Sequence, residues 1–145
     1  FTMTIPNRIS LALIASFAIA APLTGLSAVA YAHHIGAGLL MLGVGFFMFW
    51  RGWVGGGDAK LIASASLWVG LPSLLNYLLL VTLAGGVLAM AMMMFRNLTL
   101  PVFMVTQPWA VRLHDKDGGI PYGIAIAAAA IWIYPSTRWF MALGA

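Results

Sequence analysis

The sequence contains no cysteine and very few charged residues. Three of its 145 residues are acidic and seven are Lys or Arg, so charged residues make up 7% of the chain. Without cysteine, the chain can form no disulfide, no thiolate metal site and no cysteine nucleophile. Soluble domains carry about 25% charged residues. A water-soluble fold of this size is therefore excluded, because so few charges could not cover its surface.

Apolar residues take the place of the missing charges. They make up 63% of the chain, and the mean hydropathy is +1.00. Apolar content this high excludes a disordered chain. The net charge of +4 does not indicate a nucleic-acid partner, because the bases are scattered singly and form no patch. The remaining class is a polytopic membrane protein whose partner is the lipid bilayer.

The apolar residues gather in segments separated by proline, glycine and polar residues. We expect an all-α transmembrane helical bundle, because lipid-exposed backbone must satisfy its own hydrogen bonds and no alternating strands that could build a barrel are present. Residues 1–145 are expected to form a single integral-membrane domain with about five membrane-embedded segments. These segments are 9–21, 35–50, 61–71, 74–95 and 120–133. Two of them, 9–21 and 61–71, are short for full crossings.

The basic residues predict the orientation of these segments. If successive segments cross in alternating directions, six bases share one face: Arg8, Arg51, Lys60, Arg96, Arg112 and Lys116. Only Arg138 falls on the other face. This bias predicts that the shared face is cytoplasmic. The acidic residues Asp58, Asp115 and Asp117 lie on the same face, so any polar chemistry is expected at that membrane boundary.

Asp58 is the most informative of these polar residues. It follows three glycines and opens an apolar segment, and an ionisable residue at the end of a span is a functional candidate by default. Partial burial would raise the pKa of its carboxyl group, as acid–base chemistry near neutral pH requires. The alternative is a flexible glycine turn in which Asp58 caps a helix N-terminus, a contact worth about 1 kcal/mol. The residues alone leave both interpretations open.

Three short motifs in order resemble the type IV prepilin peptidases, a family of GxGD membrane aspartic proteases. Gly55-Gly56-Gly57-Asp58-Ala59-Lys60-Leu61 is similar to the G-x-G-D-x-K-L form of that motif. Ile5-Pro6-Asn7 matches the I-P-N segment that follows the first catalytic aspartate of the family, and Pro121-Tyr122-Gly123 resembles its P-Y-G segment. The short length and the lack of a cysteine-bearing N-terminal domain are similar to the minimal branch that processes Flp-type pilins for tight-adherence systems.

The resemblance implies an activity. It predicts an endopeptidase of the bacterial inner membrane that cleaves the leader peptide of Flp-like prepilins at the cytoplasmic face, with no cofactor and no metal. Two aspartates would share a proton and activate water. Asp58 matches the second aspartate, and Gly55, Gly57, Lys60 and the other two motifs would shape the site. Pilus or secretion assembly components are further expected partners, and methyl transfer is not expected.

The first aspartate of the pair should precede Ile5, yet positions 1 to 4 contain no acid. Residue 1 is Phe rather than an initiator Met, so we expect the chain to be truncated at its N-terminus and inactive as written. Asp115 or Asp117 could replace the missing partner, but their glycine-rich, mixed-charge surroundings favour a solvated turn.

The residues leave two alternatives open, one for Lys60 and one for the whole chain. Lys60 is either a member of the site, acting on the aspartate or on substrate, or a lysine that snorkels at a helix end. His33 and His34 do not predict a metal site, because adjacent residues of a helix point about 100° apart. For the whole chain, the rival to a peptidase is a small non-enzymatic scaffold or transporter subunit. The spans have few mid-membrane polar groups, which disfavours transport.

Overall fold

The computed structural model describes residues 5–99, 106–115, 118–137 and 139. Across these residues the regular structure is entirely helical, which confirms the all-α prediction. The elements are α1 (Asn7–Leu23), α2 (Ala28–Trp50), α3 (Gly56–Val69), α4 (Leu71–Asn97), α6 (Pro108–His114), α7 (Tyr122–Ile133) and the 3-10 turn η1 (Tyr134–Ser136).

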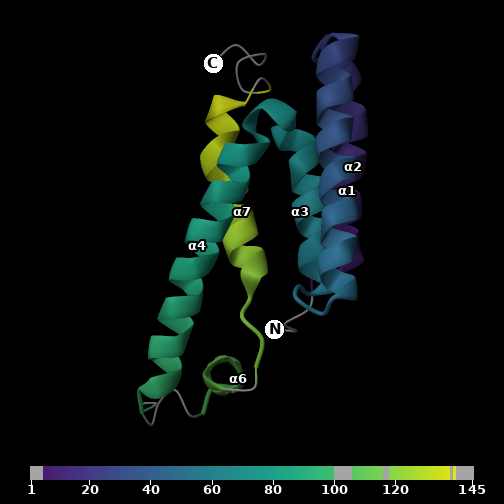
Figure 1. The fold of residues 1–145 in the computed structure, drawn as a ribbon. Coiled ribbons are helices and arrows are strands. Elements are labelled where there is room, and N and C mark those ends of the chain that lie inside the picture. The colour runs from purple at the N-terminus through teal and green to yellow at the C-terminus, as the bar shows by residue number, and fades with distance from the viewer. Residues whose placement is uncertain (1–4, 100–105, 116–117, 138, 140–145) are drawn as a thin grey trace.

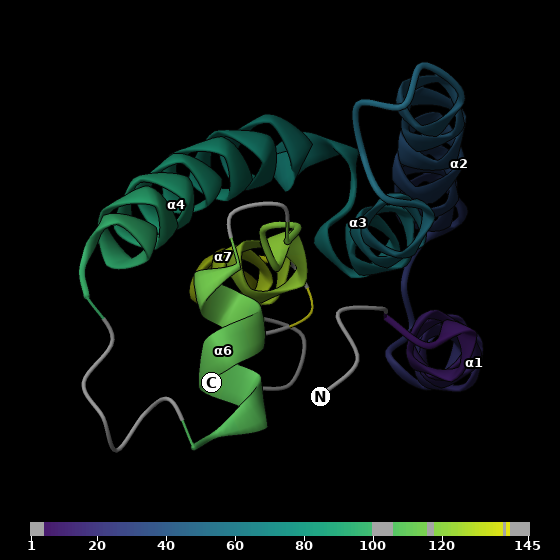
Figure 2. The same cartoon turned by 90° about the horizontal axis from the view of Figure 1, so that it is seen from below.

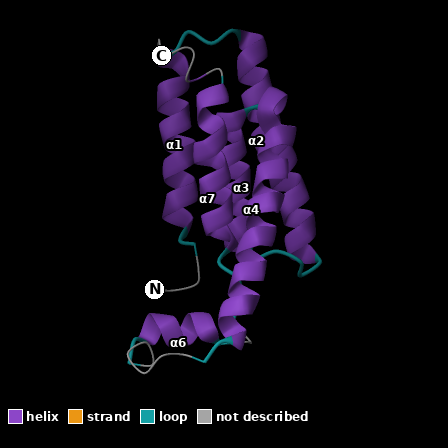
Figure 3. Ribbon diagram, turned by 90° about the vertical axis from the view of Figure 1, so that its left-hand side faces the viewer, coloured by secondary structure: helices purple, strands orange, loops and turns teal. Residues whose placement is uncertain are grey.

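The long helices run alternately up and down in one bundle (Figures 1 and 3). Helix α3 occupies its centre and packs against α1, α2, α4 and α7. Seen from below, α3 lies among α1, α2 and α7, while α4 begins beside α3 and runs along α7 (Figure 2). The short helix α6 lies across the lower end (Figure 3). The starts of α1, α3 and α7 therefore share one end of the bundle with the ends of α2 and α4.

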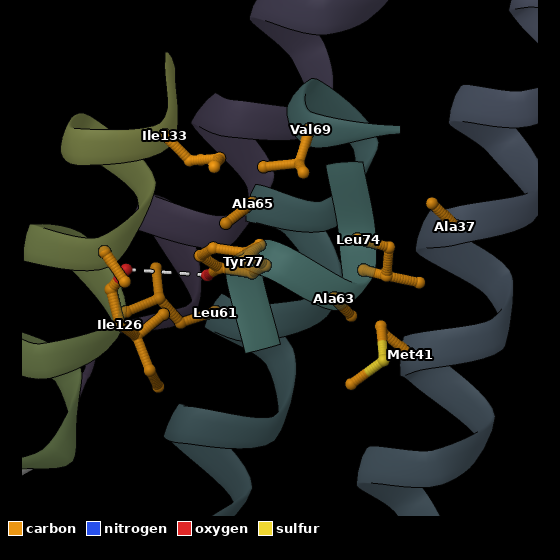
Figure 4. Close-up of a cluster of buried hydrophobic side chains, with 11 residues drawn as sticks. Ala37, Met41, Leu61, Ala63, Ala65, Val69, Leu74, Tyr77, Ile126 and Ile133 are labelled. Atoms are coloured by element: carbon orange, nitrogen blue, oxygen red, sulfur yellow. Dashed lines mark hydrogen bonds between the residues drawn. The ribbon is translucent and has the colours of Figure 1, made fainter. Parts of the chain in front are cut away.

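Small residues allow the helices around α3 to approach closely. A Cβ atom added to Gly38 of α2 would lie 2.6 Å from Cδ2 of Leu67, and one added to Gly45 would lie 3.1 Å from Cβ of Ala59. Such close approach is the usual basis of helix association in lipid. On the other side of the core, Tyr77 Oη of α4 donates to the carbonyl of Ile126 in α7 across 3.5 Å (Figure 4).

Among the described residues, two helices, α2 and α4, are long and apolar enough to cross a membrane. The expectation of about five membrane-embedded segments is therefore wrong by this criterion. Helix α3 has only 14 residues, because it begins after Gly55 and ends at Gly70, whose φ of +74° stops the helix. Helices α1 and α7 have 17 and 12 residues. A crossing needs about 20 residues.

Some predicted boundaries also differ from the observed ones. Helix α4 begins at Leu71 and runs through Pro72, where the sequence suggested a break. Proline is tolerated there because the first-turn N–H groups have no intrahelical acceptor. Between the predicted segments 74–95 and 120–133, residues 108–114 form the additional helix α6, which continues to His114.

Candidate functional site

Asp58 lies in the first turn of α3 and is not its N-cap. The N-cap is Gly55, and the helix begins at Gly56, so two of the three glycines are helical. Asp58 is the third helical residue. The N-cap interpretation that the sequence left open is therefore wrong. The missing Cβ of Gly55 leaves room for the carboxylate, since a Cβ there would lie 3.3 Å from Asp58 Oδ2.

The Asp58 carboxylate is half-buried and faces the start of α7. Burial raises its pKa above the ordinary value of 3.8, and the backbone N–H of Gly123 opposes this shift by donating a hydrogen bond to the carboxylate. Burial is the larger of the two effects. Asp58 is outside the two candidate spans. This arrangement keeps a proton on the carboxyl group to higher pH than on an exposed aspartate.

Ile5 fills the space between α3 and α7 beside this carboxylate. A Cβ atom added to Gly57 would lie 3.1 Å from Cβ of Ile5 and 3.4 Å from its backbone nitrogen. A Cβ atom added to Gly123 would lie 2.8 Å from Cδ1 of Ile5 and 3.7 Å from Oδ1 of Asp58. The two glycines therefore permit a close approach that no other residue would allow without displacement. They bring the first and third sequence motifs to Asp58.

Lys60 belongs to the same motif as Asp58 but contacts a different neighbour. Its Nζ atom donates to Oδ1 of Asn7 across 3.1 Å. Residues two apart on a helix point about 200° from each other, and Lys60 is not among the causes that shift the pKa of Asp58. Lys60 therefore joins the start of α1 to α3 and is not an electrostatic partner of the carboxylate.

Pro121 and Tyr122 hold the start of α7. Pro121 is the N-cap of α7, and its carbonyl accepts from the N–H of Ile124 across 3.1 Å. The ring of Tyr122 packs on Gly85 of α4, where an added Cβ would lie 3.4 Å from two ring carbons. Tyr122 therefore packs toward α4, while the next residue, Gly123, meets the carboxylate.

Arg96 is a member of this region that the sequence analysis treated only as an orientation marker. From the last turn of α4, its Nε atom donates to the carbonyl of Leu113 across 3.0 Å, and its Nη2 atom donates to the carbonyl of Gly119 across 3.1 Å. Backbone carbonyls occur in every residue, so no sequence pattern could have identified these acceptors.

The other polar candidates lie elsewhere. The carbonyl of Asp115 accepts from the N–H of Gly118 across 3.2 Å, which is a turn, the interpretation favoured from the sequence. Asp117, and the segment 1–4 expected to approach Asp58, lie outside the described residues. His34 is buried near the opposite end of α3, where its Nδ1 atom is 2.7 Å from the carbonyl of Leu67.

Two apolar grooves flank α1, and α3 forms the floor of both. The groove between α1 and α2 has a volume of about 350 Å³, with Asn7 and Lys60 among its lining residues. The groove between α1 and α7 has a volume of about 370 Å³ and includes Leu61, one helical turn beyond Asp58. Its walls are Ile9 and Leu13 of α1 and the α7 residues Ile126, Ala127, Ala130 and Ile131. The second groove thus leads away from the carboxylate.

The comparisons with known proteins give one match. The family model of the type IV leader peptidases matches residues 1–90, which include Ile5-Pro6-Asn7 and the whole segment from Gly55 to Lys60. Searches of curated proteins and of solved structures found no match. The matched region covers α1, α2, α3 and most of α4. With more than half of its residues matched, the chain belongs to the type IV leader peptidase family.

Proposed function

We propose that this chain is a membrane-embedded aspartic endopeptidase that cleaves the leader peptide of Flp-like type IV prepilins. One observation carries the proposal. The carboxylate of Asp58 is half-buried, accepts the N–H of Gly123 and has Ile5 beside it. Residues of all three motifs therefore meet at a single carboxylate. The first two motifs lie within the region that the family model matches, and the third, Pro121-Tyr122-Gly123, lies outside it. A structural cap would not need this convergence.

The chemistry requires a second carboxylate. In an aspartic peptidase, two carboxyl groups share a proton, one activates water as a base and the other donates as an acid. A raised pKa suits Asp58 to holding the shared proton. The backbone nitrogen of Ile5 lies 3.4 Å from where a Cβ of Gly57 would be, so Ile5 lies next to the first turn of α3. We place the partner aspartate before Ile5, as the resemblance of the Ile5-Pro6-Asn7 segment implies.

The proposed location is the cytoplasmic face of the bacterial inner membrane. Arg8, Arg51, Lys60 and Arg96 all belong to helix ends at the end of the bundle that holds Asp58. A concentration of bases at one membrane face marks the cytoplasmic side. The active site of a multi-pass protein would then be open to the side on which prepilins are synthesised.

The groove between α1 and α7 supports a substrate with an apolar segment next to the cleaved bond. The groove begins at Leu61, and its lining is almost entirely apolar. A chain placed in it must bury apolar side chains and satisfy its own backbone hydrogen bonds, as a helix does. The polar leader would remain outside the groove, beyond Asp58.

A cleavage assay tests the proposed function. A Flp-type prepilin is co-expressed with the protein as its gene encodes it, and leader removal is followed by a mobility shift. Asp58→Asn should abolish cleavage, because asparagine preserves size but cannot exchange a proton near neutral pH. The matched control Asp115→Asn should cleave like the wild type. Cleavage by the Asp58→Asn variant at the wild-type rate would remove the protease assignment.

A further inference from the structure

We propose that Arg96 is the residue that positions the start of α7 against Asp58. This inference rests on the proposed function, because its effect is on the reaction at that carboxylate. Within the described part of the chain, the hydrogen bonds of the Arg96 side chain go to backbone carbonyls and not to Asp58. Its guanidinium instead joins two carbonyls, those of Leu113 and Gly119, on either side of the connection between α6 and α7. A planar guanidinium offers two donors in a fixed fork, which suits it to this bridge.

The bridge fixes both ends of a short connection. Leu113 lies in the last turn of α6, and Gly119 lies three residues before the first residue of α7. The guanidinium also packs closely on the loop, because a Cβ added to Gly118 would lie 3.4 Å from Nη2. Since Arg96 is in the last turn of α4, the loop is attached to the helix that already packs along α7.

The path from Gly119 to Gly123 is stiff. The N–H of Tyr122 donates to the carbonyl of Ile120 across 2.8 Å, and the ring of Pro121 restricts φ, here −75°. A displacement of Gly119 is therefore transmitted to Gly123, whose N–H contacts the Asp58 carboxylate. Arg96 thereby sets the position of the Gly123 N–H, which contacts the Asp58 carboxylate, although Arg96 itself does not contact that carboxylate.

A second contact from the same helix supports this role. Tyr122 packs on Gly85 of α4, three turns before Arg96. Helix α4 therefore holds the start of α7 at two points, Gly85 and Arg96. The Tyr122 contact is apolar and leaves the ring 42% exposed, so it restricts sliding less than two hydrogen bonds of 3.0 and 3.1 Å.

The test measures kcat and KM for cleavage of a purified Flp-type prepilin by the protein as its gene encodes it, in detergent. Arg96→Gln should lower kcat about 10- to 100-fold with KM changed less than about 3-fold, because misplacing a catalytic group by about 1 Å can cost about 100-fold. Arg96→Lys, which keeps the charge and most of the stem, should restore part of kcat. The control Arg51→Gln removes a guanidinium that packs on the rings of Phe47, Trp50 and Trp53 at the same end of the bundle, and should leave kcat unchanged.

Three results would overturn the inference. Wild-type kcat in Arg96→Gln shows that the bridge does not act on the reaction. A raised KM with unchanged kcat makes Arg96 a substrate contact instead. If Arg96→Gln does not fold, kcat is measured for Arg96→Lys instead. A wild-type kcat in Arg96→Lys would then count against the positioning role. Asp58→Asn is measured alongside: wild-type cleavage by it removes the proposed function and this inference together, whereas loss by Asp58→Asn with full activity of Arg96→Gln removes only the inference.

Discussion

Nζ of Lys60 lies 3.1 Å from Oδ1 of Asn7, although the two residues are 53 positions apart in the chain. The hydrogen bond joins the first turn of α1 to the first turn and a half of α3. Asp58 and Lys60, which belong to the same motif, therefore have different roles. Asp58 faces Gly123, whereas Lys60 holds the segment that leads from Ile5 into α1.

The hydrogen bond between Lys60 and Asn7 predicts that substitutions of the two residues affect the free energy of unfolding non-additively. Lys60→Met and Asn7→Ala should each lower the free energy of unfolding, and their double-mutant cycle should give a coupling of about 0.5–1 kcal/mol, the range for an exposed charged hydrogen bond. Unfolding in detergent micelles measures it. Thr82→Ala, on the outer part of α4, should combine additively with Asn7→Ala, as distant sites do. Zero coupling between Lys60 and Asn7 would contradict the contact.

The start of α3 shows where sequence reasoning succeeded and where it failed. Composition alone predicts helices, and the resemblance predicts that Ile5 and Asp58 belong to one site. The helical state of Gly56 and Gly57 is not predictable, because glycine disfavours helix by about 1 kcal/mol relative to alanine. Tertiary contacts override that preference here: Gly57 meets Ile5, and Gly56 meets the ring of Phe49.

Long-range contacts explain the other failures. The burial of Trp139 is one example, because this residue is 1% exposed and packs against Phe17, His34 and Trp68. No local pattern places residue 139 beside residues 17, 34 and 68. Arg96 was missed for a related reason, since its partners are backbone carbonyls from a distant loop. Both contacts depend on how the helices pack rather than on the residues next to each position.

The raised pKa of Asp58 predicts how stability depends on pH. Below the unfolded-state pKa of 3.8, Asp58 is protonated in both states and has no effect. As pH rises, the unfolded state ionises first, because burial holds the folded-state pKa higher. The wild type should therefore lose stability relative to Asp58→Asn as pH rises through the interval between the two pKa values, and the difference should then stay constant.

Thermal unfolding of the two proteins between about pH 3 and about pH 8 measures this difference, since proton linkage sets its slope. Asparagine keeps the size of the side chain, so packing changes little. Asp115→Asn serves as the reference for removing an exposed acid at the same end of the bundle. A wild type that gains stability relative to Asp58→Asn with rising pH would mean that the carboxylate is stabilised, not penalised, by its surroundings.

Gly70 predicts a large loss of stability on substitution. Its φ of +74° and ψ of 162° fall in a region almost confined to glycine, which costs a residue with a Cβ about 1–3 kcal/mol. A Cβ there would also lie 2.9 Å from Cε1 and Nδ1 of His34, a ring fixed by its contacts with Leu67 and Phe17. We expect Gly70→Ala to add about 1–3 kcal/mol of overpacking to the backbone strain.

Gly25 provides the matched control for this prediction. Its φ is +61°, but nothing lies within 4 Å of its added Cβ. Gly25→Ala should therefore show the backbone strain alone, about 1–2 kcal/mol. The free energies of unfolding of the two variants are compared in the same detergent. Equal losses would show that the His34 ring yields to the new methyl group.

The two glycines on either side of Ile5 give the last prediction. An added Cβ at Gly57 would lie 3.1 Å from Cβ of Ile5, and its next contacts are the backbone nitrogen and oxygen of Ile5 at 3.4 and 3.5 Å. At Gly123 the close contact is Cδ1 of Ile5, the end of a side chain that can rotate away. Gly57→Ala must therefore move the backbone that leads toward the proposed partner aspartate. We expect it to lower prepilin cleavage by about 10-fold or more, as a small misplacement of a catalytic group does.

The control is Gly123→Ala, which should reduce cleavage by less than about 3-fold, since the required shift stays within one flexible side chain. Both variants are assayed in the protein as its gene encodes it, at matched membrane levels. Greater damage from Gly123→Ala than from Gly57→Ala would mean that the backbone path through Ile5 does not set the geometry at Asp58.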